Sequence, residues 1–356
     1  MPVPSTPPEM LDLIIKHYSD DPKTLFSCSL VSKSWLQSTR YQLFGDIVLH
    51  LGGSHEARFL ALLGHPLCTF STSVRKIWVL PTQGTDLSKQ VNDNIAQLGQ
   101  LTSVRTLRIH RQKIIPPQTL AALATAFKYI TTLVMMLRFP VLSDAIQFMC
   151  SFPVLEEVHF EPVRTQSGDF PSADITMPPQ LRSLHLDTIR SHERWFADNR
   201  VASLSTLSIA NIRPLDDVAR LDEMLEIFNA NIRHLTLRFA SQKGDFDVRV
   251  NLGHNTQLRY VEIDFSKLTR RHVFHALTSV RSSHLETIVW RTRRAFNFPA
   301  ELWSGLDILL ADRDALPMLT KFVIMAPPPS KATFNPRVHM PNCDALGILS
   351  GEEEIP

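Results

Sequence analysis

One pattern of apolar residues recurs along most of this chain and constrains its fold more than any other feature. An apolar anchor residue, position 0, is followed by apolar residues at +3 and +5. Ten copies are clear: Val74/Ile77/Val79, Val104/Leu107/Ile109, Ile130/Leu133/Met135, Leu155/Val158/Phe160, Leu181/Leu184/Leu186, Leu204/Leu207/Ile209, Ile232/Leu235/Leu237, Leu258/Val261/Ile263, Leu285/Ile288/Trp290 and Leu319/Phe322/Ile324. Successive anchors lie 23 to 34 residues apart, and this near-regular period indicates a repeat architecture. Phe44/Ile47/Leu49 fits as an earlier copy.

Each repeat has room for one strand and one helix. The alternation at +3 and +5 suits a short strand that turns every second side chain inward. Helical patterns lie between copies, as in Leu120/Leu123/Phe127, Val218/Leu221/Leu225 and Leu302/Leu306/Leu309. A strand plus a helix in roughly 26 residues resembles the leucine-rich repeat. The resemblance implies an α/β solenoid over residues 46–325, with parallel strands on its concave face.

The chain departs from that family at one position in each repeat. Regular leucine-rich repeats carry Asn or Cys shortly after the strand, where the side chain bonds buried backbone. Here the corresponding residues are Gln112, Val163, Ile189 and Ile212. We therefore expect an irregular repeat register.

Three short helical patterns precede the repeats, within the first 45 residues. Thr6, Pro7 and Glu9 predict the start of the first helix, with Thr6 as its cap. The segment Asp20-Asp21-Pro22-Lys23 is expected to end that helix and to cap the second one. So small a bundle has little interior, yet it carries many large apolar side chains. Part of this apolar surface is therefore expected to lie against another chain or against the next domain.

The same segment, PPEMLDLIIKHYSDDPKTLFSCSLVSKSWLQSTRYQLF, resembles an F-box over about residues 5–44. The likeness lies in order and spacing: a Pro-Pro-Glu opening, a Leu-Ile-Ile stripe, and Leu-Val-Ser followed by Trp. It implies docking to a Skp-type adaptor, which bridges to a cullin. The implied docking residues are Pro8, Met10, Ile14, Ile15, Leu25, Leu30, Val31 and Trp35. Some of them must instead hold the helices together, because the bundle needs a core of its own.

Positions +2, +4 and +6 of each copy should point away from the core. On the predicted concave face they place a mixed set of charged, aromatic and histidine side chains, of which eight are candidates for binding a target protein: Trp78, Arg108, His159, His185, Arg238, Tyr260, Glu262 and Arg291. Arg and aromatic residues dominate the binding energy of protein interfaces. The alternative is that this is an ordinary solvated strand face.

His159 and His185 occupy equivalent positions in consecutive repeats, as do Glu161 and Asp187. A metal site would need such a cluster, but it also needs four ligands in tetrahedral geometry, and stacked strands bring only pairs together. We predict no metal and read the histidines as surface residues.

Catalysis finds almost no support in the sequence. No Walker loop, GxGxxG, HExxH or GxSxG motif occurs, and the chain has only 12 glycines. The four cysteines are far apart, as expected of reduced thiols in an intracellular protein. A net charge of +2 gives no global field toward nucleic acid or membrane. We predict a non-enzyme without cofactors, in the cytoplasm or nucleus.

The tail after residue 325 is rich in proline and small polar residues, and we expect a cap followed by disorder over residues 326–356. Together the two resemblances predict a substrate-recognition subunit of an SCF-type (Skp-cullin-F-box) ubiquitin ligase. In this interpretation the F-box of residues 1–45 docks the adaptor and the repeats hold the target. The alternative is a non-catalytic interaction scaffold that acts outside ubiquitination.

Overall fold

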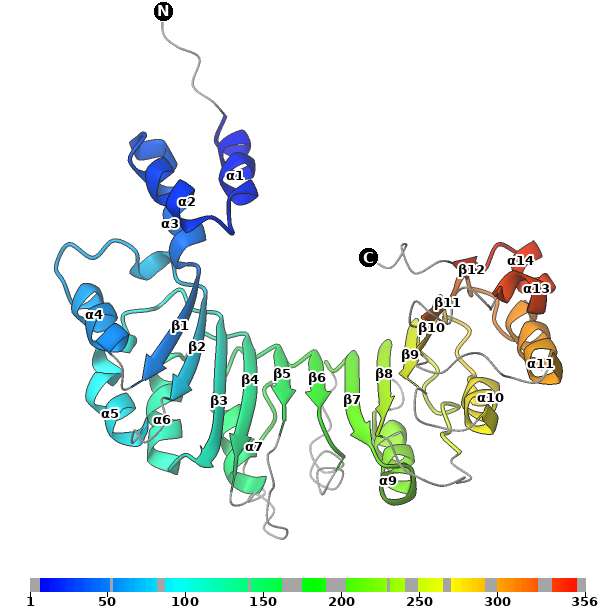
Figure 1. Cartoon of the computed structure of the whole chain (residues 1–356). Helices are drawn as coiled ribbons and strands as arrows, with labels where there is room; N and C mark the ends of the chain where they lie inside the picture. The colour runs from blue at the N-terminus through cyan, green and yellow to red at the C-terminus, as the bar shows by residue number, and fades with distance from the viewer. Residues whose placement is uncertain are drawn as a thin grey trace, which may run out of the picture. The chain divides into compact units, whose positions relative to one another are not determined.

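The computed structural model describes eleven segments of the chain: residues 7–51, 54–81, 87–139, 142–161, 175–189, 203–228, 231–240, 249–264, 270–291, 300–325 and 335–350. Within them the chain divides into two compact units, Met1–Pro178 and Pro179–Pro356. The strands form one parallel sheet in chain order, β1 to β12, with helices between them (Figure 1). The predicted fold class, an α/β repeat array that follows three N-terminal helices in the chain, is confirmed.

The first unit begins with three helices, α1 (Pro8–His17), α2 (Pro22–Ser29) and α3 (Lys33–Phe44). Its strands are β1 (Asp46–Leu51), β2 (Lys76–Pro81), β3 (Thr106–Ile114), β4 (Thr132–Arg138) and β5 (Glu157–Phe160). The connecting helices α4 (Ser54–Leu63), α5 (Leu87–Leu98), α6 (Pro117–Ala126) and α7 (Leu142–Cys150) pack side by side in chain order. A short 3-10 helix, η1 (Ser71–Ser73), precedes β2.

The second unit contains β6 (Ser183–Leu186), β7 (Thr206–Ile212), β8 (His234–Phe239), β9 (Tyr260–Asp264), β10 (Thr287–Arg291), β11 (Lys321–Met325) and β12 (Leu349–Ser350). Its helices are α9 (Pro214–Ile227), α10 (Arg270–Ser279), α11 (Ala300–Ala311), α13 (Pro336–His339) and α14 (Pro341–Ala345). The last two helices pack on α11, and β12 pairs with β11. Residues 335–350 thus close the end of the sheet, while 326–334 and 351–356 lie outside the described residues.

The predicted strand pattern matches the burial of the described side chains in most strands, but in β9, β10 and β11 the residue at +4 is buried as well. In β5 and β6, residues at +3 and +5 are buried and those at +2 and +4 are half-buried. The anchors at position 0 are buried as well, for example Val74, Leu155 and Leu258. The apolar core of each unit therefore consists of one row of anchors and two rows of strand side chains, covered by the helices.

A repeated backbone contact holds successive copies in register. The N–H groups at +1 and +2 of one copy both donate to the carbonyl at +1 of the copy before it. Arg105 N and Thr106 N donate to Arg75 O at 2.8 and 3.0 Å, and Arg233 N and His234 N donate to Ser205 O at 2.8 and 3.0 Å. These bonds satisfy the backbone where each turn enters its strand. The same contact occurs at Gly45 O, which identifies the copy beginning at Phe44 as the first repeat.

The N-terminal helices join this sheet without a linker. Helix α3 ends at Phe44, and β1 begins at Asp46. A Cβ on Gly45 would lie 2.4 Å from the carbonyl oxygen of Tyr41, so only glycine fits at the joint. Phe44 stacks on Phe70 with ring centroids 4.7 Å apart, which ties the end of α3 to the turn before β2.

The irregular register expected from the missing Asn positions is observed. Pairing shifts between β3 and β4 after His110, and between β7 and β8 after Ile209. Ile189 and Ile212, which stand where Asn is usual, are buried and extend the apolar core. The structure satisfies the backbone in another way. Buried Asn255 donates to Leu225 O at 3.0 Å.

Serines supply similar contacts in the second unit. The Ser282 hydroxyl is buried and lies 2.7 and 2.9 Å from the carbonyl oxygens of Leu258 and Thr256. The Ser203 hydroxyl lies 2.8 and 2.9 Å from the carbonyl oxygens of Leu181 and Pro179. These polar residues precede their strands, whereas the family signature follows the strand.

Candidate interaction surfaces

Large apolar side chains are exposed on α1, on α2 and on the turn after α2. We call this set the helical apolar surface: Met10, Leu13, Ile14, Phe26, Leu30 and Val31, whose exposed fractions run from 37% for Ile14 to 73% for Leu30. Four of them, Met10, Ile14, Leu30 and Val31, belong to the predicted docking set. Leu13 and Phe26 do not, although the same clustering of apolar residues in the sequence could have identified them.

Three described residues of the predicted docking set are not on this surface. Ile15 and Leu25 are 0% and 1% exposed and form the core of the helical bundle together with Leu11. Trp35 is partly buried against the same core. The physical reason is that α1 and α2 both pack on α3, and the side chains facing that contact leave water. The side chain of Pro8 lies outside the described part of the chain.

The start of the helical bundle also differs from expectation. Helix α1 begins at Pro8 with Pro7 at its N-cap, and no side chain caps it. Thr6 lies outside the described residues. Helix α2 begins as predicted, because the Asp21 carboxylate accepts from Lys23 N and Thr24 N at 3.1 and 3.2 Å. These two bonds and one from the Thr24 hydroxyl lower the pKa of Asp21.

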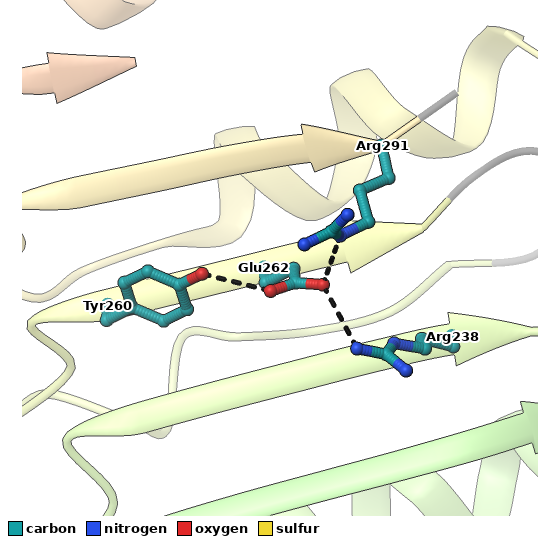
Figure 2. A network of polar contacts seen from close by, with 4 residues as sticks. All are labelled: Arg238, Tyr260, Glu262 and Arg291. Atoms are coloured by element: carbon teal, nitrogen blue, oxygen red, sulfur yellow. Dashed lines mark hydrogen bonds and ion pairs between the residues drawn. The ribbon is translucent and has the colours of Figure 1, made fainter. Parts of the chain in front are cut away.

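In the second unit, four predicted target-binding residues meet in one network on β8, β9 and β10 (Figure 2). Glu262 stands at its centre. Its Oε1 lies 2.5 Å from Arg291 Nε and 3.4 Å from Arg238 Nη2, and its Oε2 accepts from the Tyr260 hydroxyl at 2.9 Å. Strand pairing accounts for part of this convergence. Arg238 and Arg291 both lie directly opposite Asp264, and Glu262 is two residues before Asp264 on β9, within reach of both long side chains.

Within this network, the Glu262 carboxylate and the guanidinium groups of Arg238 and Arg291 balance one another's charges in large part. The Glu262 side chain is 8% exposed, whereas Arg238 and Arg291 are 52% and 36% exposed. A buried carboxylate is stable only with such partners. Burial and the adjacent Glu262 charge raise the pKa of Tyr260, so the phenol stays protonated and donates its hydrogen bond. The four residues therefore form a rigid polar patch, with both guanidinium groups reaching solvent.

In the first unit, Trp78 and Arg108 form a stacked pair. They lie directly opposite each other on β2 and β3, and the Arg108 guanidinium carbon is 4.5 Å from the centre of the Trp78 ring. Both side chains are half-buried. Among the described residues Arg108 forms no ion pair, unlike Arg238 and Arg291. The pair is thus a cation held by an aromatic face.

The two predicted histidines lie on different strands. His159 on β5 lies next to Glu157 of the same strand, with His159 Nε2 2.7 Å from Glu157 Oε1. His185 is half-buried on β6 in the second unit. All eight predicted target-binding residues therefore lie at outward positions of strands, grouped as the Trp78–Arg108 pair, the Glu262 network and two histidines.

Two cysteines, Cys150 and Cys343, have thiol pKa values above the ordinary value, which makes these thiols less reactive. Burial raises the pKa of Cys150 to about 12 and, together with the nearby Asp307 carboxylate, the pKa of Cys343 to about 12. Both side chains are therefore neutral thiols near pH 7, poor nucleophiles and poor metal ligands. In the described part of the chain, no helix combines the length and apolar character needed to cross a membrane.

Comparison with known proteins adds little to this picture. No protein-family profile matches the chain, and no curated protein matches it. Among solved structures, 43 chains match. One is a Bacteroides fragilis protein determined as a structural genomics target, with 13% identity and a TM-score of 0.36, over 79% of this chain and 74% of that one. Such a distant likeness does not bear on function.

Proposed function

We propose that this protein is the substrate-recognition subunit of an SCF-type ubiquitin ligase. Its N-terminal helices dock a Skp-type adaptor, through it a cullin, and its repeats bind a target protein in the cytoplasm or nucleus. Its contribution is to raise the effective concentration of the target near the catalytic partner, through contacts rather than chemistry.

The observation that carries the proposal is the helical apolar surface. Six large apolar side chains are exposed on a bundle whose fully buried core consists of Leu11, Ile15 and Leu25. Exposed apolar clusters of this kind mark protein interaction sites. The F-box resemblance of the same helices implies that the partner is a Skp-type adaptor. The Arg and aromatic side chains on the outward strand positions supply a second surface suited to protein recognition.

The test is co-purification of the full chain with a Skp-type adaptor. The variant Ile14→Asp/Leu30→Asp places two charges on the helical apolar surface, and both positions are exposed, so the chain should remain folded. The matched control is Leu62→Asp/Leu67→Asp, which makes the same change at two exposed leucines outside the three helices. We expect a stoichiometric complex with the wild type and the control, and its loss with the first variant.

Two outcomes would count against the proposal. A wild-type chain that does not bind the adaptor favours the alternative, a non-catalytic scaffold that uses its repeats outside ubiquitination. A complex that survives Ile14→Asp/Leu30→Asp means that docking uses another surface, and the assignment of the helical apolar surface is then wrong.

A further inference from the structure

Two arginine sites on the outward strand positions differ in how their charge is balanced. Arg238 and Arg291 share the buried Glu262 carboxylate. Arg108 has no carboxylate partner among the described residues, and its guanidinium lies over the face of the Trp78 ring. A bound carboxylate gains the most binding free energy at a half-buried guanidinium that has no counter-charge. The reason is that the cation there is already partly desolvated and oriented.

Two hydrogen-bond donors of this pair also lack an acceptor among the described residues. Arg108 Nε and Trp78 Nε1 are both buried and have no hydrogen-bond acceptor within the described ranges of the chain. An unmatched buried donor destabilises the folded chain. Such groups call for a physical explanation, because nearly all buried polar atoms are paired. The flexible Arg108 side chain can rotate to present its Nε–H to an acceptor that a partner supplies.

The side chains directly opposite the pair on β1 and β4 are apolar, whereas exposed His50 and His110 lie two residues further along β1 and β3 on the same face. Val48 lies opposite Trp78 and is 49% exposed, and Val134 lies opposite Arg108. Two residues further along β2 and β4, Leu80 and Met136 are half-buried on the same face. A cation surrounded by aliphatic and aromatic surface fits a ligand with one carboxylate between apolar groups.

A polyanion fits this face poorly. The +2 positions of β1 to β5 hold Asp46, Lys76, Thr106, Thr132 and Glu157, so this row offers two carboxylates and only one cation. The two carboxylates would repel a string of phosphates, and nucleic-acid binding requires several cations with aromatic residues between them. A single carboxylate needs only one guanidinium.

We propose that the Trp78–Arg108 pair, with Val48, Leu80, Val134 and Met136, is the binding surface for a peptide segment of the target that carries an Asp or Glu between apolar residues. The carboxylate bonds the Arg108 guanidinium, and the neighbouring apolar side chains cover Trp78 and Val48. This inference rests on the part of the proposed function in which the repeats bind a target, and not on adaptor docking.

The test uses the full chain and a panel of short dye-labelled peptides, each with one Asp or Glu flanked by aliphatic or aromatic residues. A second panel replaces the acid with Asn or Gln, and fluorescence anisotropy measures binding. We expect members of the acidic panel to bind, and their amide counterparts to bind at least about tenfold more weakly. Arg108→Gln should weaken the binding of acidic peptides by about tenfold or more. Arg108→Lys, which keeps the charge but loses the planar stack, should fall between.

Arg259→Gln is the matched control, because it removes a half-exposed guanidinium that lies outside the eight predicted target-binding residues, and it should leave peptide binding unchanged. Thermal melting of each variant shows that it is folded. The proposal is overturned if no acidic peptide binds the wild type, if the amide peptides bind as well, or if Arg108→Gln binds like the wild type. The Ile14→Asp/Leu30→Asp variant should retain peptide binding. A wild-type chain that binds the acidic peptides but not the adaptor refutes the adaptor-docking part of the proposed function and leaves this surface standing.

Discussion

At the scale of single residues, Glu262 is the group on which the polar patch of the second unit depends. It is almost fully buried, yet it contacts two guanidinium groups and one phenol. Neighbouring Glu286 makes one contact, to Arg259 Nη1 at 3.3 Å, with both side chains about half exposed. The two carboxylates lie in adjacent repeats and differ mainly in burial, so they allow a direct comparison of buried and exposed ion pairs.

We expect Glu262→Gln to lower the free energy of unfolding by about 1–3 kcal/mol, because a buried charged acceptor is lost and its partners remain. The same substitution at Glu286 should cost roughly 0–1 kcal/mol, the usual worth of an exposed pair. Urea denaturation followed by circular dichroism measures both. Equal losses in the two variants would contradict the structural role of Glu262.

Strand residues could be assigned from the sequence more reliably than helix residues. In a strand, period-two alternation separates inward from outward side chains, and Trp78, Arg238 and Tyr260 were correctly predicted to point outward. Helix α1 has apolar residues around most of its circumference, at Met10, Leu11, Leu13, Ile14 and Ile15. Periodicity therefore cannot say which of them face α3, and Ile15 was wrongly placed on the docking surface.

At the scale of elements, the repeat pattern predicted β1 to β11 because each of these strands needs apolar residues at +3 and +5. It did not predict β12, a strand of two residues that carries no such pattern. It also missed the helices after residue 335. These elements are held by a buried carboxylate on α11, Asp307, and by the buried side chains of Met340, Cys343 and Ile348, which follow no strand or helix period.

Asp307 fastens the end of the chain to the sheet. Its carboxylate accepts from Asn342 N and Cys343 N at 3.0 and 2.8 Å, where α14 begins. Asp307→Ala leaves these donors unmatched and should cost about 1–3 kcal/mol. Asp312→Ala is a suitable control, because the Asp312 carboxylate also accepts two backbone N–H groups but is exposed to water.

Hydrogen exchange followed by mass spectrometry measures the effect locally. We expect faster exchange across α13, α14 and β12 in Asp307→Ala, with little change in Asp312→Ala. Unchanged protection of these elements in Asp307→Ala would mean that apolar packing alone, through residues such as Met340 and Ile348, holds the cap.

At the scale of the whole molecule, the chain exposes two kinds of side-chain surface. Apolar side chains are exposed on the N-terminal helices, whereas mixed aromatic and charged side chains occupy the outward strand positions. The first type suits stable docking of a constant partner, and the second suits selection among targets by a few oriented contacts. These two kinds of surface are what the proposed receptor function requires.

The most direct test of this account is hydrogen exchange of the full chain with and without a saturating amount of Skp-type adaptor. We predict that the adaptor slows exchange in α1 and α2 and leaves β2, β3 and β4 unchanged, because docking covers the helical apolar surface alone. An absence of protection in α1 and α2, or equal protection along the strands, would contradict the central claim that the N-terminal helices are the adaptor-docking element.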